Sequence, residues 1–262
     1  EDLTLSKPFL DGIDEVQFVA CGTSYHASKY GKLLVERLAD VRATVEYASE
    51  YEIGSGRDPT RTLAVGVSQS GETADTLRAL RTANRSGIRT LGVTNTVGST
   101  MARECDDVVY IRAGPEIGVA ATKTFASQVV ILALFALTVA DLRGELDATA
   151  GRELLENLQN VPGAIQGALD DDESVEEVAH AYADGEAFFF IGRYFGNPVA
   201  LEGALKLKEI SYDHAEGFPA GELKHGPLAL VTERTPVLAL LTAGTRPEET
   251  RNNVKEVQSC GA

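Results

Sequence analysis

The residues from Ser68 to Thr73 read Ser-Gln-Ser-Gly-Glu-Thr and are mostly small, hydroxyl-bearing or flexible. They follow the apolar run Leu63–Val67, which predicts a strand, and precede a predicted helix that begins near Ala74 with Asp75 in its first turn. A loop in this position offers free backbone N–H groups, the positive end of a helix dipole and hydroxyl donors. These groups would bind a phosphate monoester. The alternative is that Ser and Thr only cap the helix.

A second hydroxyl-rich loop, Cys21-Gly22-Thr23-Ser24, follows the predicted strand Val16–Ala20. Ligands of open α/β sheets bind where the strand order reverses, outside the carboxyl ends of the strands. Two hydroxyl-rich loops that meet there favour a binding site over helix capping. Neither loop has the Gly-Lys-Ser/Thr of a nucleotide P-loop, and the chain has no Gly-x-Gly-x-x-Gly. We therefore expect no ATP, NAD or other cofactor.

Acid-base residues lie on a predicted helix from Ala200 to Ser211. Glu202, Lys206 and Glu209 fall at i, i+4 and i+7, so their side chains share one face of that helix. The alternative is a surface ladder of weak ion pairs. Three of the chain's eight Lys residues lie between positions 206 and 224, which favours a specific role in a chain that otherwise avoids Lys.

His225 lies in a predicted loop bounded by Gly and Pro, Gly221–Pro227. An imidazole can move protons near neutral pH, although a loop His can also be merely solvated. Proton transfer between adjacent carbons through an enediol or enamine needs one carboxylate over both carbons and cationic or N–H partners for the oxyanion. Such chemistry needs no metal. We expect none, because His214, His225 and Glu222 match no common ligand spacing.

The elements that position these residues are those of an α/β protein. Short apolar runs that end in Gly/Ser/Thr loops and are followed by helix-length amphipathic segments are typical of parallel α/β units. The predicted strands of the first lobe are Val16–Ala20, Leu63–Val67, Thr90–Val93 and Val108–Ile111. We predict a flavodoxin-like, doubly wound lobe over residues 1–141, followed by an acidic, helical connector over 142–177 in which Asp170–Glu173 is a solvated turn.

The same pattern restarts in a second predicted lobe over residues 178–262, with strands Ala187–Ile191 and Val237–Leu241. Gly22 precedes Ser68 by 46 residues and Gly192 precedes Thr242 by 50, which indicates an internal duplication. We therefore predict two flavodoxin-like, doubly wound parallel-sheet lobes. Because the chain ends within the helix after the second strand, we expect the second lobe to be C-terminally incomplete. The alternative, a naturally small lobe, would leave exposed sheet edges.

Composition restricts the class of protein and of partner. The chain has 262 residues, of which 44% are hydrophobic, so it can bury a sizeable core. Its formal net charge of −15 argues against nucleic-acid and anionic-membrane partners. Only eight of its 24 basic residues are Lys, and a Lys-poor, acid-rich surface suggests a halophilic source. The alternative is an ordinary acidic cytosolic protein.

Cysteine use and the apolar runs both indicate a cytoplasmic protein. Cys21, Cys105 and Cys260 are odd in number and scattered, which fits a reducing compartment rather than a disulfide framework. The longest apolar run, Val129–Ala140, has twelve residues and is too short to cross a bilayer, so we expect a buried helix. The N-terminus shows no export signal.

Three motifs, Cys21–Ser24, Ser68–Thr73 and Glu116–Lys123, together with the string from Ala200 to Leu230, resemble the sugar isomerase (SIS) domains of the glucosamine-6-phosphate synthase family. The resemblance covers nearly the whole chain. It implies that the sugar phosphate is held by Ser68, Gln69, Ser70 and Thr73, and that the sugar is contacted by Gly22, Thr23, Ser24, Val119 and Ala121. Many relatives carry Ser where this chain has Ala121, which puts a hydroxyl contact there in doubt.

The same resemblance implies roles for the acid-base residues. Glu209 would move a proton between C1 and C2, His225 would assist opening of the sugar ring, and Glu202 and Lys206 would support them. In relatives the His-bearing loop reaches the neighbouring subunit's site, which implies a homodimer with His225 acting in trans. We call the loop Ser68–Thr73 the serine-rich turn, and we expect the hexose to lie between this turn and Glu209.

Family members also have an N-terminal glutaminase, whose first-residue Cys starts the supply of ammonia to fructose 6-phosphate. This chain has no counterpart of that domain, and Cys21 lies in a predicted sheet-edge loop instead. A family Lys near the C-terminus, which pairs with the sugar carbonyl, has no counterpart either. We therefore expect a fragment that binds fructose 6-phosphate or glucosamine 6-phosphate but turns over slowly or not at all.

The function implied by the resemblance is the sugar-phosphate isomerase module of a glutamine-fructose-6-phosphate transaminase (isomerizing). It would catalyse proton transfer between ketose and aldose. Two alternatives remain open, a stand-alone SIS glucosamine-6-phosphate deaminase/isomerase and a non-catalytic sugar-phosphate sensor. An upstream glutaminase in the same reading frame would support the synthase, whereas a sensor would tolerate Glu209→Gln.

Overall fold

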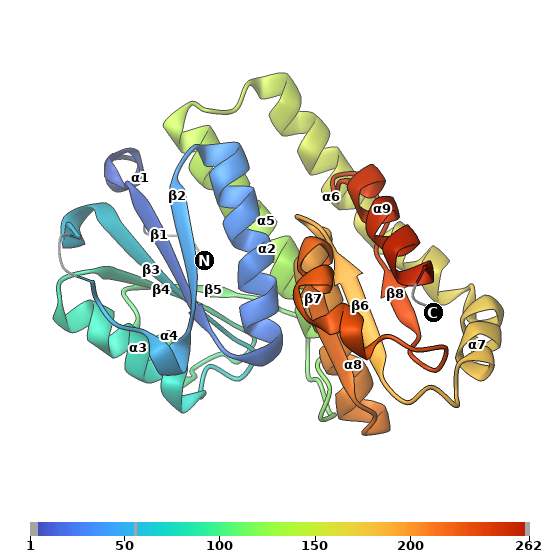
Figure 1. Cartoon of the computed structure of the whole chain (residues 1–262). Coiled ribbons are helices and arrows are strands. Elements are labelled where there is room, and N and C mark those ends of the chain that lie inside the picture. The colour runs from blue at the N-terminus through green and yellow to red at the C-terminus, as the bar shows by residue number, and fades with distance from the viewer. Residues whose placement is uncertain (1–4, 55–56, 260–262) are drawn as a thin grey trace. The chain divides into compact units, whose positions relative to one another are not determined.

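The computed structural model describes residues 5–54 and 57–259, so Cys260 lies outside the described residues. The chain divides into two compact units, 1–151 and 152–262, which we call the first and second lobes. The boundary falls within a long helix, α6 (Ala148–Leu169), which follows α5 (Lys123–Arg143) along the chain (Figure 1).

The first lobe is built on a five-stranded sheet in the order β2-β1-β3-β4-β5, and all of its strand pairs are parallel. Its strands are β1 (Glu15–Ala20), β2 (Arg42–Tyr47), β3 (Thr62–Ser68), β4 (Arg89–Thr94) and β5 (Asp107–Tyr110). Every residue of β1 and β3 is buried, which explains why the central strands are continuous apolar runs. This order is flavodoxin-like, and its direction reverses between β1 and β3.

Helices cover both faces of this sheet (Figure 1). They are α1 (Lys7–Gly12), α2 (Gly22–Ala39), α3 (Ala74–Arg85), α4 (Thr100–Glu104) and α5 (Lys123–Arg143), with short 3-10 turns at η1 (Ala48–Glu50) and η2 (Pro59–Arg61). Alternate residues of β1 point to opposite faces, because Phe18 packs in the core under α2 and α5 while Val19 packs with Leu77 and Leu80 of α3. The lobe is therefore doubly wound, as the sequence predicts.

Helix α5 is a core helix of the first lobe. Among residues 5–54 and 57–259, it alone has the length and hydropathy that would allow a membrane crossing. However, it packs along α2, and Leu132, Phe135 and Ala136 belong to the main core cluster of the lobe. The expected buried helix over 129–140 is thus confirmed, and it extends over 21 residues.

The second lobe has a smaller parallel sheet in the order β7-β6-β8. Its strands are β6 (Phe188–Gly192), β7 (Ala215–Pro219) and β8 (Val237–Ala239), and its helices after α6 are α7 (Asp172–Ala181), α8 (Gly196–Ser211), η3 (Ala220–His225), η4 (Pro227–Leu230) and α9 (Pro247–Gln258). Phe189, Ile191 and Leu223 form its small core with Val257 of α9.

The two sheets share a topology that supports an internal duplication. The order β7-β6-β8 repeats the order β2-β1-β3, and in each lobe the middle strand leads directly into a helix, α2 after β1 and α8 after β6. Strands β2 and β7, which lie at one side of each sheet, were not predicted from the sequence. The shared strand order therefore extends over three strands of each lobe instead of two.

Candidate functional site

The loops that follow β1 and β3 line one cavity in the first lobe. The two strands are parallel neighbours with Ala20 opposite Val67, so both loops leave the sheet at the same edge, where the strand order reverses. The cavity has a volume of about 160 Å³, and we call it the cradle cavity. Its lining residues are Cys21, Thr23, Ser24, Val67, Ser68, Gln69, Ser70, Thr73, Ala121, Thr124 and Gln128.

Hydrogen bonds within the serine-rich turn fix its conformation. Gly71 N donates to Ser68 Oγ over 3.1 Å, and Ser68 Oγ lies 3.0 Å from Thr73 Oγ1. Gly71 has φ of +67°, and a Cβ added there would lie 2.3 Å from Ser99 Oγ. Glycine is therefore required at this position, both by backbone conformation and by space.

The cradle cavity is suited to an anion although its described lining residues carry no charge. Helices α2 and α3 begin in its two loops, and their N-cap residues, Cys21 and Thr73, make no side-chain capping hydrogen bond. The alternative that these hydroxyls only cap a helix therefore does not describe Thr73. Uncapped helix N-termini and neutral hydroxyls supply the donors and the positive potential that an oxyanion requires.

A third segment lines the cavity beside the two loops, and this segment leads into α5. Glu116 fixes its conformation. Its carboxylate accepts a hydrogen bond from Thr122 N over 3.0 Å and further bonds from the backbone N–H and the hydroxyl of Thr124. Burial raises the pKa of Glu116, but the hydrogen bonds from Thr124 and Thr122 outweigh it and hold that pKa below its ordinary value. This ionised clamp holds Ala121 and Thr124 at the cavity.

Two predicted sugar contacts do not line the cradle cavity. Gly22 is exposed at the start of α2, and Val119 is 88% exposed in the loop before α5. Conversely, Thr124 and Gln128 were not predicted as site residues, yet both lie on α5, are fully buried and line the cavity. The available signal was a Gln inside a largely apolar helix, because a buried amide needs a polar partner.

In the second lobe, α8 brings Glu202, Lys206 and Glu209 together on one face, as their spacing predicts. Lys206 Nζ lies 3.3 Å from Glu202 Oε1 and 2.5 Å from Glu209 Oε2. Glu202 is 4% exposed, so the set is not a solvated surface ladder. Glu209 is the most accessible of the three, and Lys206 is its immediate basic neighbour.

His225 is exposed at the end of η3, on a different element from the α8 set. His214 lies elsewhere in the second lobe, with Nε2 3.2 Å from Glu216 Oε1. Within residues 5–54 and 57–259, no group of three or more His, Cys, Asp or Glu side chains is arranged to hold a metal ion.

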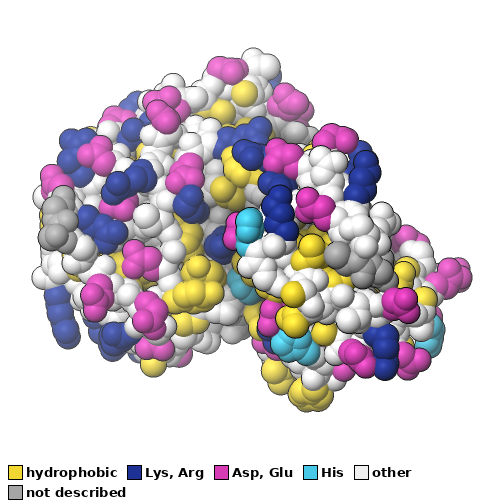
Figure 2. All heavy atoms as spheres, viewed as in Figure 1, with side chains coloured by type: hydrophobic (Ala, Val, Ile, Leu, Met, Phe, Trp, Pro, Cys, Tyr) yellow, Lys and Arg dark blue, Asp and Glu magenta, His cyan; other side chains and the backbone are white. Residues whose placement is uncertain are grey.

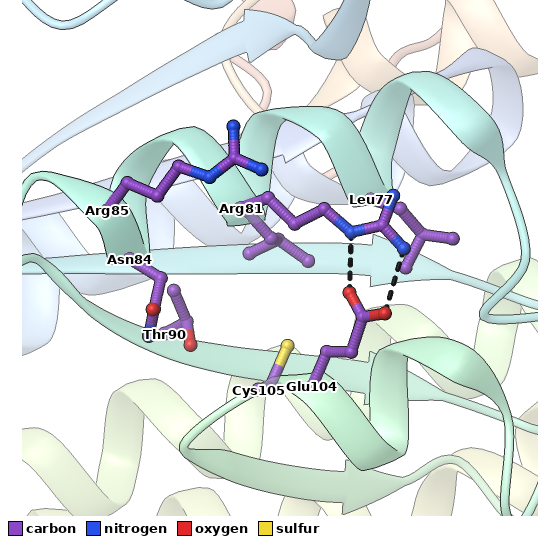
Figure 3. A pocket seen from close by; sticks show the side chains of 8 residues that line it. Leu77, Arg81, Asn84, Arg85, Thr90, Glu104 and Cys105 are labelled. Carbon is purple, nitrogen blue, oxygen red and sulfur yellow. Dashed lines mark hydrogen bonds and ion pairs between the residues drawn. The ribbon is translucent and has the colours of Figure 1, made fainter.

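A larger cavity of about 220 Å³ in the first lobe is a poorer candidate (Figure 3). Of the two Arg residues that line it, Arg81 is bound through two nitrogens to Glu104 at 2.6 and 2.8 Å. Burial raises the pKa of the Cys105 thiol to about 12, so the thiol is unreactive near neutral pH. Size alone therefore does not identify the site.

The described surface on the face seen in Figure 2 shows no basic patch of the kind that binds nucleic acid. On that face, Lys and Arg side chains of the first lobe are interspersed with Asp and Glu. Many charges of the lobe are paired at the surface, for example Arg61 with Asp14 and Lys32 with Glu36. This pattern agrees with the net charge of −15.

The family model of the SIS domain matches residues 10–138 and 182–262. The chain is 57% identical over 261 residues to a glutamine–fructose-6-phosphate aminotransferase [isomerizing] of Halobacterium salinarum, and 48% identical over 259 residues to that of Methanosarcina acetivorans. These matches cover 100% and 99% of this chain but only 43% and 42% of the relatives. The chain thus spans less than half the length of these relatives.

Solved structures give the same picture of the fold. The C-terminal domain of glucosamine-fructose-6-phosphate aminotransferase from Francisella tularensis matches with a TM-score of 0.93 and 41% identity, over 97% of this chain and 72% of that one. A glucosamine-6-phosphate deaminase from Thermotoga maritima matches with a TM-score of 0.77 and 26% identity, over 98% of this chain and 79% of that one.

Proposed function

The chain belongs to the SIS domain family, and from this premise we propose that it is the sugar-phosphate isomerase module of a glutamine–fructose-6-phosphate aminotransferase (isomerizing). The observation that carries the proposal is the cradle cavity, which joins hydroxyl-rich loops and uncapped helix N-termini at the point of strand reversal. The substrates are fructose 6-phosphate and glucosamine 6-phosphate.

The first lobe anchors the substrate through its phosphate. Ser68, Gln69, Ser70 and Thr73 surround the phosphate oxygens with hydroxyl, amide and backbone donors, and the first turns of α2 and α3 add their dipoles. Thr23, Ser24 and Ala121 face the sugar, with Gly22 and Val119 in the adjoining loops. Ala121 offers no hydroxyl, so its contact with the sugar is apolar.

The second lobe carries the proton transfer. Glu209 removes a proton from C1 of the ketose, the C–H electron pair enters the enediol or enamine, and the same carboxyl returns a proton at C2. Lys206, in contact with both Glu209 and Glu202, orients Glu209 for this step. The reaction needs no cofactor or metal.

Ring opening and the supply of ammonia complete the proposed reaction. His225 assists opening of the sugar ring and acts in trans in a homodimer, which agrees with its exposure at the end of η3. Ammonia comes from a glutaminase domain, which agrees with the chain spanning only 43% of the Halobacterium salinarum relative. The acidic composition supports a halophilic source, and the three scattered cysteines support a cytoplasmic location.

A stand-alone glucosamine-6-phosphate deaminase is the second candidate, since a deaminase shares the fold. Identity favours the aminotransferase, because it reaches 57% and 41% against aminotransferase sequences and structures and only 26% against the deaminase structure. A non-catalytic sensor has no specific support. It would have no need of the partly buried Glu202–Lys206–Glu209 set.

Isothermal titration calorimetry with fructose 6-phosphate and glucosamine 6-phosphate tests the binding part of the proposal. We expect heat of binding from both esters, and an affinity about tenfold to a hundredfold lower in Ser68→Ala, which loses a donor to a charged ligand. Ser174→Ala, at an exposed position of α7, is the control and should bind as the wild type does. Absence of binding heat with both esters would remove the proposal.

Solvent-proton exchange tests the chemical part. In D₂O, the wild-type chain should introduce deuterium at C1 of fructose 6-phosphate, even if net turnover is slow. Glu209→Gln should bind the ester normally but lose exchange by about a hundredfold or more, as expected for a general base. Exchange that survives in Glu209→Gln would assign the proton transfer to another group.

A further inference from the structure

One polar side chain of α5 has no role in the function proposed so far. Gln128 is 0% exposed, lies in a helix otherwise rich in apolar residues, and lines the cradle cavity. Its Nε2 donates a hydrogen bond to Ser24 Oγ over 2.9 Å, across from α5 to the first turn of α2. It is thus a direct link between the two helices at the cavity.

The other end of the same amide is unsatisfied. Gln128 Oε1 is buried and accepts no hydrogen bond from any residue in the described part of the chain. A buried carbonyl oxygen without a donor costs free energy, whereas an apolar side chain of similar size would fill the space without that cost. The amide is therefore poorly explained by packing, and its bond to Ser24 is the interaction that compensates.

That bond fixes what Ser24 can do. Because Gln128 Nε2 occupies an acceptor site of Ser24 Oγ, the hydroxyl hydrogen of Ser24 remains to be donated elsewhere. The backbone of Ser24 is held as well, since Ser28 Oγ donates to Ser24 O over 2.7 Å. Ser24 is 8% exposed and lines the cavity, so the direction left for its hydrogen is toward a ligand.

We propose that Gln128 is a positioning residue of the sugar-phosphate site, which orients the Ser24 hydroxyl as a donor to a ligand oxygen. The inference rests on the proposed function, because it takes the cradle cavity to be the substrate site. Gln128 acts through Ser24, because its Oε1 is buried and its Nε2 already donates to Ser24 Oγ.

Two variants separate positioning from structure. Gln128→Met keeps the length of the side chain, removes the unsatisfied oxygen and loses the donor, so it should melt at the same or a higher temperature than the wild type. It should nevertheless bind fructose 6-phosphate about tenfold more weakly. Gln128→Glu offers only acceptors, so Ser24 must donate to it, and its affinity should fall further.

A double-mutant cycle shows whether Gln128 acts through Ser24. Ser24→Ala and Gln128→Met should each weaken binding about tenfold, and the double variant should be no weaker than Ser24→Ala alone. Gln166→Met, at an exposed position of α6, is the matched control and should change neither affinity nor melting temperature.

The outcomes distinguish the inference from the function on which it rests. If the wild type binds the ester and Ser24→Ala weakens it, but Gln128→Met binds normally, the inference is overturned and the proposed function stands. Additive effects in the double variant, or a loss of affinity matched by a fall in melting temperature, would also overturn it. If the wild type binds no ester, both the function and the inference fail.

Discussion

Gly71 is the residue on which the shape of the serine-rich turn depends. Gly71→Ala would have to place a Cβ 2.3 Å from Ser99 Oγ and 2.7 Å from Thr94 Oγ1, at φ of +67°. We expect the free energy of unfolding to fall by about 1–3 kcal/mol. Binding of fructose 6-phosphate should weaken as well, because the turn must shift. Urea denaturation and calorimetry measure the two effects.

Gly98 provides the matched control for this prediction. It also has positive φ, +73°, but a Cβ added there would meet nothing within 4 Å. Gly98→Ala therefore carries the backbone strain without the clash, and it should be less destabilised and bind the ester normally. Equal losses in the two variants would show that the crowding at Gly71 is unimportant.

Glu116 gives the site a dependence on pH. Its folded pKa lies below the ordinary value because Thr124 and Thr122 donate hydrogen bonds that outweigh the effect of burial. The resulting stability is fully present above the unfolded pKa of about 4.3 and is lost as pH falls through the lower, folded value. Lowering the pH from 7 to 3 should therefore reduce the difference in unfolding free energy between wild type and Glu116→Gln. A constant difference would contradict the prediction.

At the residue scale, the sequence predicts best where chemistry and regular spacing coincide. The i, i+4, i+7 spacing on α8 correctly predicts that Glu202, Lys206 and Glu209 share one face, and the loop Ser68–Thr73 lines a cavity. Gln128 could not be assigned in this way. A nearly all-apolar helix has no polar face, so its pattern does not show which side lies against the cavity.

At the scale of elements, the packing of α2 against α5 positions both Ser24 and Gln128. Gly31 of α2 allows this close approach, because a Cβ added there would lie 2.9 Å from Leu132 Cδ1 of α5. Gly31→Ala should lower the free energy of unfolding by about 1–3 kcal/mol through overpacking, despite the better helix propensity of Ala. It should also weaken ester binding by disturbing the Ser24–Gln128 bond.

Gly163→Ala in α6 tests the propensity part of this prediction alone. A Cβ at Gly163 would meet nothing within 4 Å, so Ala there should be neutral or stabilising by up to about 1 kcal/mol. Chemical denaturation of both variants measures the difference between them. If Gly31→Ala is as stable as Gly163→Ala, the two helices are less tightly packed than the structure indicates.

The elements that the sequence analysis missed have physical explanations. The strand β2 (Arg-Ala-Thr-Val-Glu-Tyr) lies at the edge of its sheet, with exposed or half-buried residues at most positions, so it lacks the continuous apolar run of β1 and β3. The strand β7 contains Gly217 and Pro219, which resemble a turn. Gly217 is required by packing, because a Cβ there would lie 2.7 Å from Leu201 Cα.

At the scale of the whole molecule, net charge should control stability. With a formal charge of −15, the folded chain repels itself, and salt screens this repulsion. The Debye length is about 10 Å at 0.1 M salt and shortens as salt is added. We therefore expect the melting temperature to rise steadily as KCl is increased from 0.1 M to 2 M. A melting temperature that falls or stays constant would contradict a halophilic adaptation.

The overall architecture was largely predictable because parallel α/β units repeat one pattern. Buried strands followed by hydroxyl-rich loops and helices indicate a doubly wound first lobe, and the repeated spacing indicates the duplication that the order β7-β6-β8 supports. The number of strands in the second sheet was not predictable. Its strand β7 is short and carries little apolar sequence, so only its parallel pairing with β6 identifies it.

The central claim is that the serine-rich turn is a phosphate site, and a crystal of this chain soaked with glucosamine 6-phosphate tests it most directly. We predict the phosphate in the cradle cavity, within hydrogen-bond distance of the Ser68, Ser70 and Thr73 hydroxyls and of the first turn of α3. A well-occupied ester bound elsewhere, with this turn empty, would contradict the claim.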